Sequence, residues 1–295
     1  MSAGGVIFKI ATGCRRALGW QLPRAGPQLY QAFWRVAPAT AEVELLPGVF
    51  FKADFRDHLR RATWWQGVRF EAPTPQVLAH FAEAVREPVF FDIGANYGFF
   101  SYWMATRPAR LRAHAFEPHP AVHALLTATR DRNSLDQLTP HQFALGDEPG
   151  TLDLYAAAAD SGRSTFGTPP GAVVAVTHRV EVKTFDTWRR EAGLELPPEP
   201  RWIAKIDVEG FEPRVLRGMR EALAARAFAL LCVEINIETL AGCGFQPADA
   251  FAVLREAGYV RIEETALARR WPVHRTNNAF FLPATPVEQT PDVAP

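Results

Sequence analysis

Two short strings in the sequence combine residue types that could bind a small molecule and act on it. The first begins at Asp92 and reads Asp-Ile-Gly-Ala-Asn-Tyr-Gly, so a carboxylate stands just ahead of a glycine-rich turn. Glycines let the backbone turn tightly and approach a ligand, and a helix that starts after the turn offers free N–H groups. Dinucleotide sites use such a turn with the spacing G-x-G-x-x-G, whereas the spacing from Gly94 to Gly98 is G-x-N-x-G.

The carboxylate of Asp92 favours one class of ligand over another. It would repel a pyrophosphate but attract an ammonium group, so the string indicates S-adenosylmethionine rather than NAD. We expect Gly94 and Gly98 to shape the turn beneath the amino-acid half of this cofactor, and Asn96 to adopt a left-handed backbone there. The alternative is an ordinary turn from a strand into a helix.

The second string runs from Lys205 to Gly210 and reads Lys-Ile-Asp-Val-Glu-Gly. Alternate residues of a strand share a face, so Lys205, Asp207 and Glu209 are predicted to point the same way. Burying three charges is costly unless they are paired, which favours a catalytic role over a structural ion pair. A hydroxyl that attacks a methyl group must lose its proton, and these three residues are the predicted proton acceptors or electrostatic partners.

Further polar residues follow the predicted strands. Glu117 ends the second strand, where an acidic residue can accept hydrogen bonds from ribose hydroxyls, and its alternative role is helix capping. Asp147 could accept from the adenine amino group or simply occupy a surface turn. His178 and His274 are weaker candidates for a base. No spacing demands a metal, although carboxylates at two strand ends could bind a divalent cation.

Apolar runs that alternate with helical segments predict an α/β fold with a mostly parallel sheet and helices on both faces. Strands are expected at 89–92, 112–116, 139–143, 202–206, 228–233, 259–262 and 279–282, and helices at 99–106, 120–132, 213–226 and 247–257. Residues 151–155 and 173–185 read as strands of an insertion around a loop at 160–171, and 192–200 reads as a proline-rich linker.

Composition limits the remaining possibilities. The 295 residues carry a formal net charge of zero, so nucleic acid is not an expected partner. Three cysteines without metal or disulfide spacing suit a reducing cytoplasm, where we expect the protein to work. No apolar stretch is long enough to span a membrane, although residues 1–20 could form an interfacial helix or dock on the core. We expect three regions: an N-terminal cap with a β-hairpin (1–75), the main domain (76–283) and a disordered tail (284–295).

Together these strings resemble the FkbM family of class I S-adenosylmethionine-dependent methyltransferases. The resemblance rests on residues 92–101, 116–118, 144–150, 205–212, 215–218 and 233–236, with the pair Ser164-Thr165. It implies a Rossmann-like sheet with an antiparallel last strand, and O-methylation of hydroxyls on sugars, glycans or secondary metabolites. By this resemblance Asp92, Gly94, Ala95, Asn96, Gly98 and Glu117 would contact the cofactor.

The sequence leaves other functions open. The acceptor could be a small molecule or a saccharide, including a lipid-linked saccharide reached by peripheral contact with a membrane. A non-catalytic scaffold that binds the cofactor is a further alternative, as is a nicotinamide-dependent oxidoreductase. Neither the acceptor nor the choice of base follows from the residues alone.

Overall fold

A central mixed sheet organises the molecule. The computed structural model describes residues 3–17, 26–107, 111–157, 160–167, 174–264 and 277–284. Within them seven strands form the central sheet, in the order β12 (Tyr259–Arg261), β13 (Asn278–Pro283), β11 (Phe228–Glu234), β10 (Trp202–Ile206), β3 (Val89–Ile93), β4 (Arg112–Phe116) and β5 (Leu138–His141). Strands β11, β10, β3, β4 and β5 are parallel, and β13 runs antiparallel to both of its neighbours. The predicted α/β sheet with an antiparallel last strand is confirmed.

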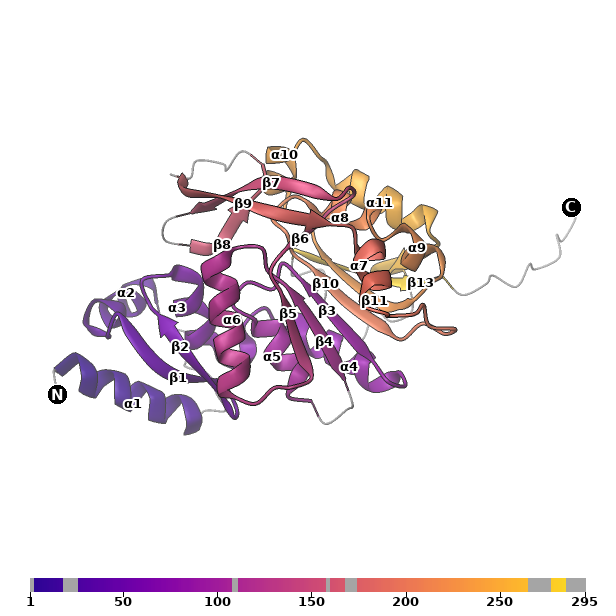
Figure 1. Cartoon of the computed structure of the whole chain (residues 1–295). Helices are drawn as coiled ribbons and strands as arrows, with labels where there is room; N and C mark the ends of the chain where they lie inside the picture. Colours follow the sequence, from indigo (N-terminus) through magenta and orange to yellow (C-terminus); the bar gives the residue numbers. More distant parts are fainter. Residues whose placement is uncertain are drawn as a thin grey trace, which may run out of the picture.

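Helices cover both faces of this sheet (Figure 1). On one face lie α4 (Thr74–Ala84), α5 (Phe99–Ala105) and α6 (Pro120–Arg132), and on the other lie α7 (Phe185–Glu191), α8 (Glu212–Arg217), α9 (Arg220–Ala224) and α11 (Pro247–Glu256). Alternation along β3 explains the two layers. Phe90 packs in the first core, whereas Val89 and Phe91 pack in the second, because successive side chains leave a strand on opposite sides.

The N-terminal segment packs on the same face as α5. It contains α1 (Ala3–Ala17), α2 (Pro27–Val36), the predicted hairpin β1 (Thr40–Leu46) and β2 (Val49–Asp54), α3 (His58–Gln66) and a short 3-10 helix, η1 (Gly67–Arg69). Its aromatic residues join the core of the sheet, and Trp64 is buried, with its ring 4.9 Å from that of Phe8. The hydroxyl of Tyr97 on the glycine turn also hydrogen-bonds to Thr63 of α3. This contact links the N-terminal segment to the glycine turn. The boundary predicted between residues 75 and 76 stays a prediction.

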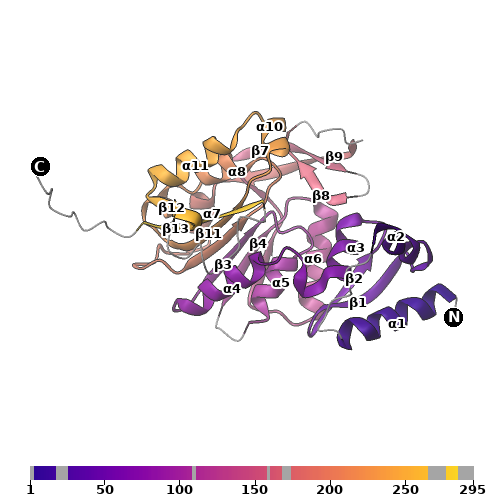
Figure 2. The ribbon, with the colours of Figure 1, turned by 180° about the vertical axis from the view of Figure 1, so that it is seen from behind.

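A second, smaller sheet covers the carboxyl ends of the central strands (Figure 2). Its order is β6 (Ala144–Leu145), β9 (Val174–Lys183), β7 (Gly150–Ala157) and β8 (Asp160–Thr165). The predicted insertion is confirmed. The prediction of an irregular loop from residue 160 was wrong for its first part, because residues 160–165 pair with β7 as strand β8.

Two predictions about helices need correction. The single helix predicted at 213–226 is two helices, α8 and α9, because the Asp186 carboxylate accepts hydrogen bonds from the N–H groups of Glu221 (2.8 Å) and Ala222 (3.2 Å) and so caps a new helix start. Helix α7, which supplies Asp186, was not predicted. Two short helices, α10 (Ile237–Gly242) and η2 (Ile262–Glu264), complete the described elements.

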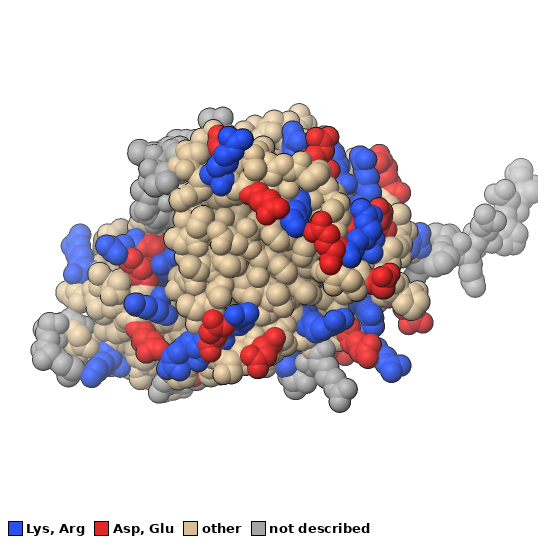
Figure 3. All heavy atoms as spheres, viewed as in Figure 1, with Lys and Arg blue, Asp and Glu red and all other residues tan. Residues whose placement is uncertain are grey.

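Two further features concern membrane-spanning helices and surface charge. No helix in the described part of the chain is long and apolar enough to cross a lipid bilayer. Lysine, arginine and acidic side chains intermix on the face shown in Figure 3, without a field of one sign. Residues 285–295 of the predicted tail lie outside the described residues.

Candidate active site

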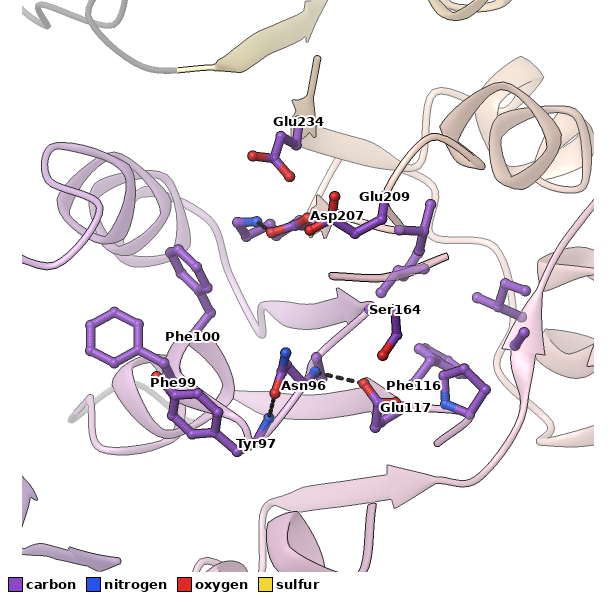
Figure 4. Close-up of a pocket in the computed structure, with 18 of the residues that line it drawn as sticks. Asn96, Tyr97, Phe99, Phe100, Phe116, Glu117, Ser164, Asp207, Glu209 and Glu234 are labelled. Carbon is purple, nitrogen blue, oxygen red and sulfur yellow. Dashed lines mark hydrogen bonds and ion pairs between the residues drawn. The ribbon is translucent and has the colours of Figure 1, made fainter. Parts of the chain in front are cut away.

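The carboxyl ends of β3, β4, β10 and β11 surround one cavity (Figure 4). Seven of the predicted site residues line it: Gly94, Ala95, Asn96, Glu117, Lys205, Asp207 and Glu209. The residues of the two sequence strings therefore meet, although they are more than 100 positions apart. Asp92, Gly98 and Asp147 are not among the residues that line the cavity.

The glycine turn after β3 is held by backbone contacts on both sides. Gly94 and Ala95 donate hydrogen bonds to the carbonyl oxygen of Phe116 at 3.0 and 2.9 Å. Gly94 has φ +83°, and a Cβ added there would lie 1.9 Å from the carbonyl oxygen of Asp207. Only glycine permits this approach of the two strings. Asn96 adopts the predicted left-handed backbone, with φ 50°, and its side-chain oxygen accepts the N–H of Tyr97 at 2.8 Å.

Glu117 joins the end of β4 to the glycine turn. Its two carboxylate oxygens accept hydrogen bonds from the N–H groups of Asn96 (2.9 Å) and His119 (2.8 Å), as Figure 4 shows for Asn96. Burial raises the pKa of Glu117 to about 7, and the two N–H groups partly offset that effect. Each oxygen keeps a further lone pair, so the side chain can still accept hydrogen bonds from a ligand in the cavity.

Asp92 was predicted to face a cofactor, but its carboxylate is buried beneath the cavity. It is buried on β3, accepts a hydrogen bond from the Ser101 hydroxyl at 2.6 Å, and lies beside Lys205 in the register of β3 and β10. Burial raises its pKa to about 6. The side chain therefore supports the start of α5 from beneath the cavity, and a direct contact with a cofactor stays a prediction.

The second string brings a buried ammonium group and two carboxyl groups together. Lys205 is 1% exposed, and its Nζ atom lies 2.5 Å from Oδ2 of Asp207 and 4.7 Å from the ring centroid of Phe100. The Asp207 charge raises the pKa of Lys205, despite the opposing effect of burial, and the Lys205 ammonium lowers the pKa of Asp207. The raised pKa favours the protonated form of Lys205, which suits an electrostatic partner, and a role of this residue in proton transfer stays a prediction.

Glu234, at the end of β11, completes this charged group. The Asp207 charge is the main reason that its pKa rises to about 11, and burial adds to the rise. Glu234 thus holds a proton at neutral pH, and a side-chain hydrogen bond joins it to the Asp207 carboxylate. The arrangement is one ammonium, one carboxylate and one carboxylic acid, so most of the buried charge is neutralised.

The turn that carries Glu209 is held by two side chains. Glu212 Oε1 accepts the N–H groups of Val208 (3.0 Å) and Gly210 (3.2 Å). Thr165 of β8 donates its hydroxyl to the carbonyl oxygen of Glu209 at 2.8 Å. Thr165 and its neighbour Ser164, which lines the cavity, thereby connect the inserted sheet to the second string.

The N-terminal segment, predicted as a cap, contributes to the cavity three residues that were not singled out from the sequence. Leu59, Phe70 and Glu71 line the cavity, and Oε2 of Glu71 accepts a hydrogen bond from Asn278 of β13 at 3.2 Å. Burial raises the pKa of Glu71. No local motif marks this residue, because its place depends on contacts with a strand some 200 positions later in the chain.

Two predicted residues in the described part of the chain, Asp147 and His178, lie outside this group. Asp147 forms an ion pair with Arg214 at 3.1 Å, and an adenine contact there stays a prediction. The ring of His178 lies 4.4 Å from that of His119, and neither residue is among those that line the cavity. His274 lies outside the described residues.

Carboxylate oxygens of Asp207, Glu209 and Glu234 all lie within 4.8 Å of one another, which is the arrangement that a divalent cation could use. The Lys205 ammonium already neutralises Asp207, however, and a cation would have to compete with it. The binding of a divalent cation by these three residues therefore remains an alternative that the Lys205–Asp207 ion pair does not favour.

Comparison with known proteins shows which family shares these strings. The methyltransferase FkbM domain matches residues 92–261. The chain is 31% identical over 182 residues to the hexuronic acid methyltransferase AglP of Haloferax volcanii, covering 59% of this chain and 64% of that protein. It is 30% identical over 144 residues to methyltransferase 1 of Beauveria bassiana, covering 43% of this chain and 57% of that protein. The chain thus spans about three-fifths of the length of these curated relatives.

Among solved structures, a precorrin-6y C5,15-methyltransferase from Geobacter metallireducens aligns with a TM-score of 0.38 and 12% identity, covering 66% of this chain and 73% of that chain. A structural similarity with this TM-score does not support any conclusion beyond the fold described above. The family match includes the glycine turn and the string from Lys205 and covers more than half of the sequence. This chain belongs to the FkbM methyltransferase family.

Proposed function

We propose that this protein is an S-adenosylmethionine-dependent methyltransferase that methylates a hydroxyl group of a sugar, a glycan or a secondary metabolite. One observation carries the proposal: a single cavity is lined on one side by the glycine turn and Glu117, and on the other by Lys205, Asp207 and Glu234. The first set suits binding of the cofactor, and the second suits handling of a proton.

The residues of the first set fit the cofactor. The Gly94–Asn96 backbone borders the cavity without a side chain at Gly94, and Glu117 retains lone pairs for two ribose hydroxyls. Leu145 and Leu154 line the same cavity and offer apolar surface for a purine ring. When bound, S-adenosylmethionine supplies a methyl group that a nucleophilic oxygen can take from its sulfonium.

We assign the proton of the acceptor hydroxyl to Asp207. Its carboxylate is ionised beside Lys205, and the proton on Glu234 stabilises that ionised form through a hydrogen bond. As the acceptor oxygen gains the methyl group, its O–H bond breaks and the proton passes to Asp207, while Lys205 stabilises the charges that remain. Holding both reactants in one cavity supplies much of the expected acceleration.

The charges that line the cavity favour a neutral, hydroxyl-rich acceptor. Glu71, Glu209 and Glu234 contribute carboxyl groups near the Asp207–Lys205 pair, and carboxyl groups readily accept hydrogen bonds from sugar hydroxyls. The name of the relative AglP, a hexuronic acid methyltransferase, supports a saccharide as the class of acceptor.

The proposal is tested by incubating the protein with S-adenosylmethionine and a panel of glycosides, and by searching for a mass gain of one methyl group. The variant Asp207→Asn should lose turnover by at least about 100-fold while still binding S-adenosylhomocysteine. Glu256→Gln, at an exposed position on α11, is the matched control and should keep the parent rate. Binding of the cofactor without turnover on any acceptor would favour the scaffold alternative.

A further inference from the structure

Helix α1 presents apolar side chains to solvent. Its inner side carries Phe8, which is 7% exposed and stacks on Trp64. Its outer side carries Val6, Ile7 and Ile10, which are 40%, 43% and 61% exposed. A surface helix normally turns polar residues outward and apolar residues toward the core. On α1 both sides carry apolar residues, and those of the outer side remain 40–61% exposed.

The outer side is a continuous stripe. Val6, Ile10, Gly13 and Ala17 follow the spacing i, i+4, i+7 and i+11, which places them on one face of a helix. All four are exposed, and none carries a charge. Lys9 is exposed as well and lies beside this stripe. We call Val6, Ile7, Ile10, Gly13 and Ala17 the outer stripe of α1.

The first 41 residues of the chain carry charges of one sign only. Residues 1–41 contain Lys9, Arg15, Arg16, Arg24 and Arg35, and the first acidic residue of the chain is Glu42. The whole sequence balances 32 basic against 32 acidic residues, so this excess belongs to the N-terminal segment. A basic segment with an exposed apolar stripe complements a surface that is both apolar and anionic.

We propose that α1 docks the protein on an anionic lipid surface, with its outer stripe inserted at the boundary of headgroups and acyl chains. Helix α1 lies along the outer edge of the molecule in both ribbon views, where a flat surface can reach it (Figures 1 and 2). Its 15 residues extend about 22 Å, which suits a helix in the plane of the membrane. The neighbouring α2 also exposes Leu29 and Val36.

This docking complements the cavity but does not depend on its chemistry. The segment that carries α1 also supplies Leu59, Phe70 and Glu71 to the cavity. The lipid contact is measured without the cofactor, so its failure leaves the methyltransferase proposal untouched.

The test is co-sedimentation of the full chain with vesicles. The parent should sediment with phosphatidylcholine vesicles that contain phosphatidylglycerol, should not sediment with pure phosphatidylcholine, and should be released by added salt. Ile10→Asp should weaken binding by at least about tenfold, and Lys9→Glu by at least about fivefold. Both positions are exposed, so both variants should keep the parent melting temperature.

Two matched controls test whether the position on α1 matters. Ile237→Asp changes an exposed isoleucine on α10 that is 69% exposed, and Arg255→Glu reverses an exposed charge on α11; both should bind vesicles like the parent. The proposal is overturned if the parent ignores anionic vesicles, or if the controls lose binding as much as the α1 variants. A parent dimer that Ile10→Asp converts to a monomer in light scattering would instead assign the outer stripe to a second copy of the chain.

Discussion

Lys205→Met removes the buried positive charge of the site and keeps a side chain of similar length. In the parent, the ammonium is 1% exposed and 2.5 Å from the Asp207 carboxylate, with Glu71 and Glu234 also contributing to its raised pKa. The variant leaves those carboxyl groups around an uncompensated Asp207. Breaking a buried pair by removing one partner costs about 3–5 kcal/mol, so we expect a loss of that size in the free energy of unfolding near about pH 8.

The loss should shrink as the pH falls. In the parent, Lys205 keeps the pKa of Asp207 low, so the ion pair persists well below neutral pH. Without the ammonium, burial raises the pKa of Asp207 above its unfolded value. A carboxyl group with a raised folded pKa destabilises the protein above that pKa, and the penalty disappears as the pH falls to the unfolded value near 4.

Urea unfolding of parent and variant at several pH values measures this difference. Glu117 and Glu212 affect both proteins alike, whereas Asp92, Glu71 and Glu234 also lose the charge of Lys205 and add to a loss of the same sign. The matched control is Lys52→Met, an exposed lysine on β2, which should change the free energy of unfolding by less than about 0.5 kcal/mol. A Lys205→Met loss below about 1 kcal/mol near pH 8, or a loss that does not vary with pH, would refute the account of the charged group.

Three further predictions concern the turn and its carboxylates. Gly94→Ala should lower the free energy of unfolding in urea by about 3 kcal/mol or more, because the new Cβ would meet the Asp207 carbonyl oxygen. The control Gly48→Ala, at φ +79° with no atom within 4 Å, should lower it by only about 1–2 kcal/mol. Equal losses in the two variants would contradict the close approach at Gly94. Glu117→Gln should lose about 1–3 kcal/mol of stability, since an amide can accept only one of the two N–H groups, and an unchanged urea midpoint would count against these bonds. The free energy of unfolding of the parent should fall as the pH rises from about 5 to about 8, because the folded pKa values of Glu117 and Glu212 are both raised to about 7 and these buried groups then lose their protons. A free energy of unfolding that rises with pH over this range would contradict their burial.

Much of the central sheet follows from local patterns in the sequence. The apolar runs that became β3, β4, β10 and β11 are short, bounded by polar residues and separated by helical segments, so periodicity alone locates them within a residue or two. The break between α8 and α9 could not be seen that way, because the Asp186 cap comes from a helix that is distant in the sequence.

The candidate site was partly predictable for a related reason. Residues at the carboxyl ends of parallel strands meet at one edge, which is why Glu117 and Asp207 could be placed together from sequence. The pattern does not say which way a side chain turns at the end of a strand, and Asp92 turned to Ser101 rather than to the cavity. Glu71 needed the tertiary contact with Asn278, which no spacing reveals.

The central claim is that the cavity binds S-adenosylmethionine, and calorimetric titration with S-adenosylhomocysteine tests it most directly. The parent should bind with micromolar affinity, Glu117→Ala should weaken binding by about 1–3 kcal/mol, and Glu256→Ala, an exposed carboxylate on α11, should bind like the parent. A folded parent that does not bind, or a Glu117→Ala variant that binds as tightly as Glu256→Ala, would contradict the assignment of this cavity to the cofactor.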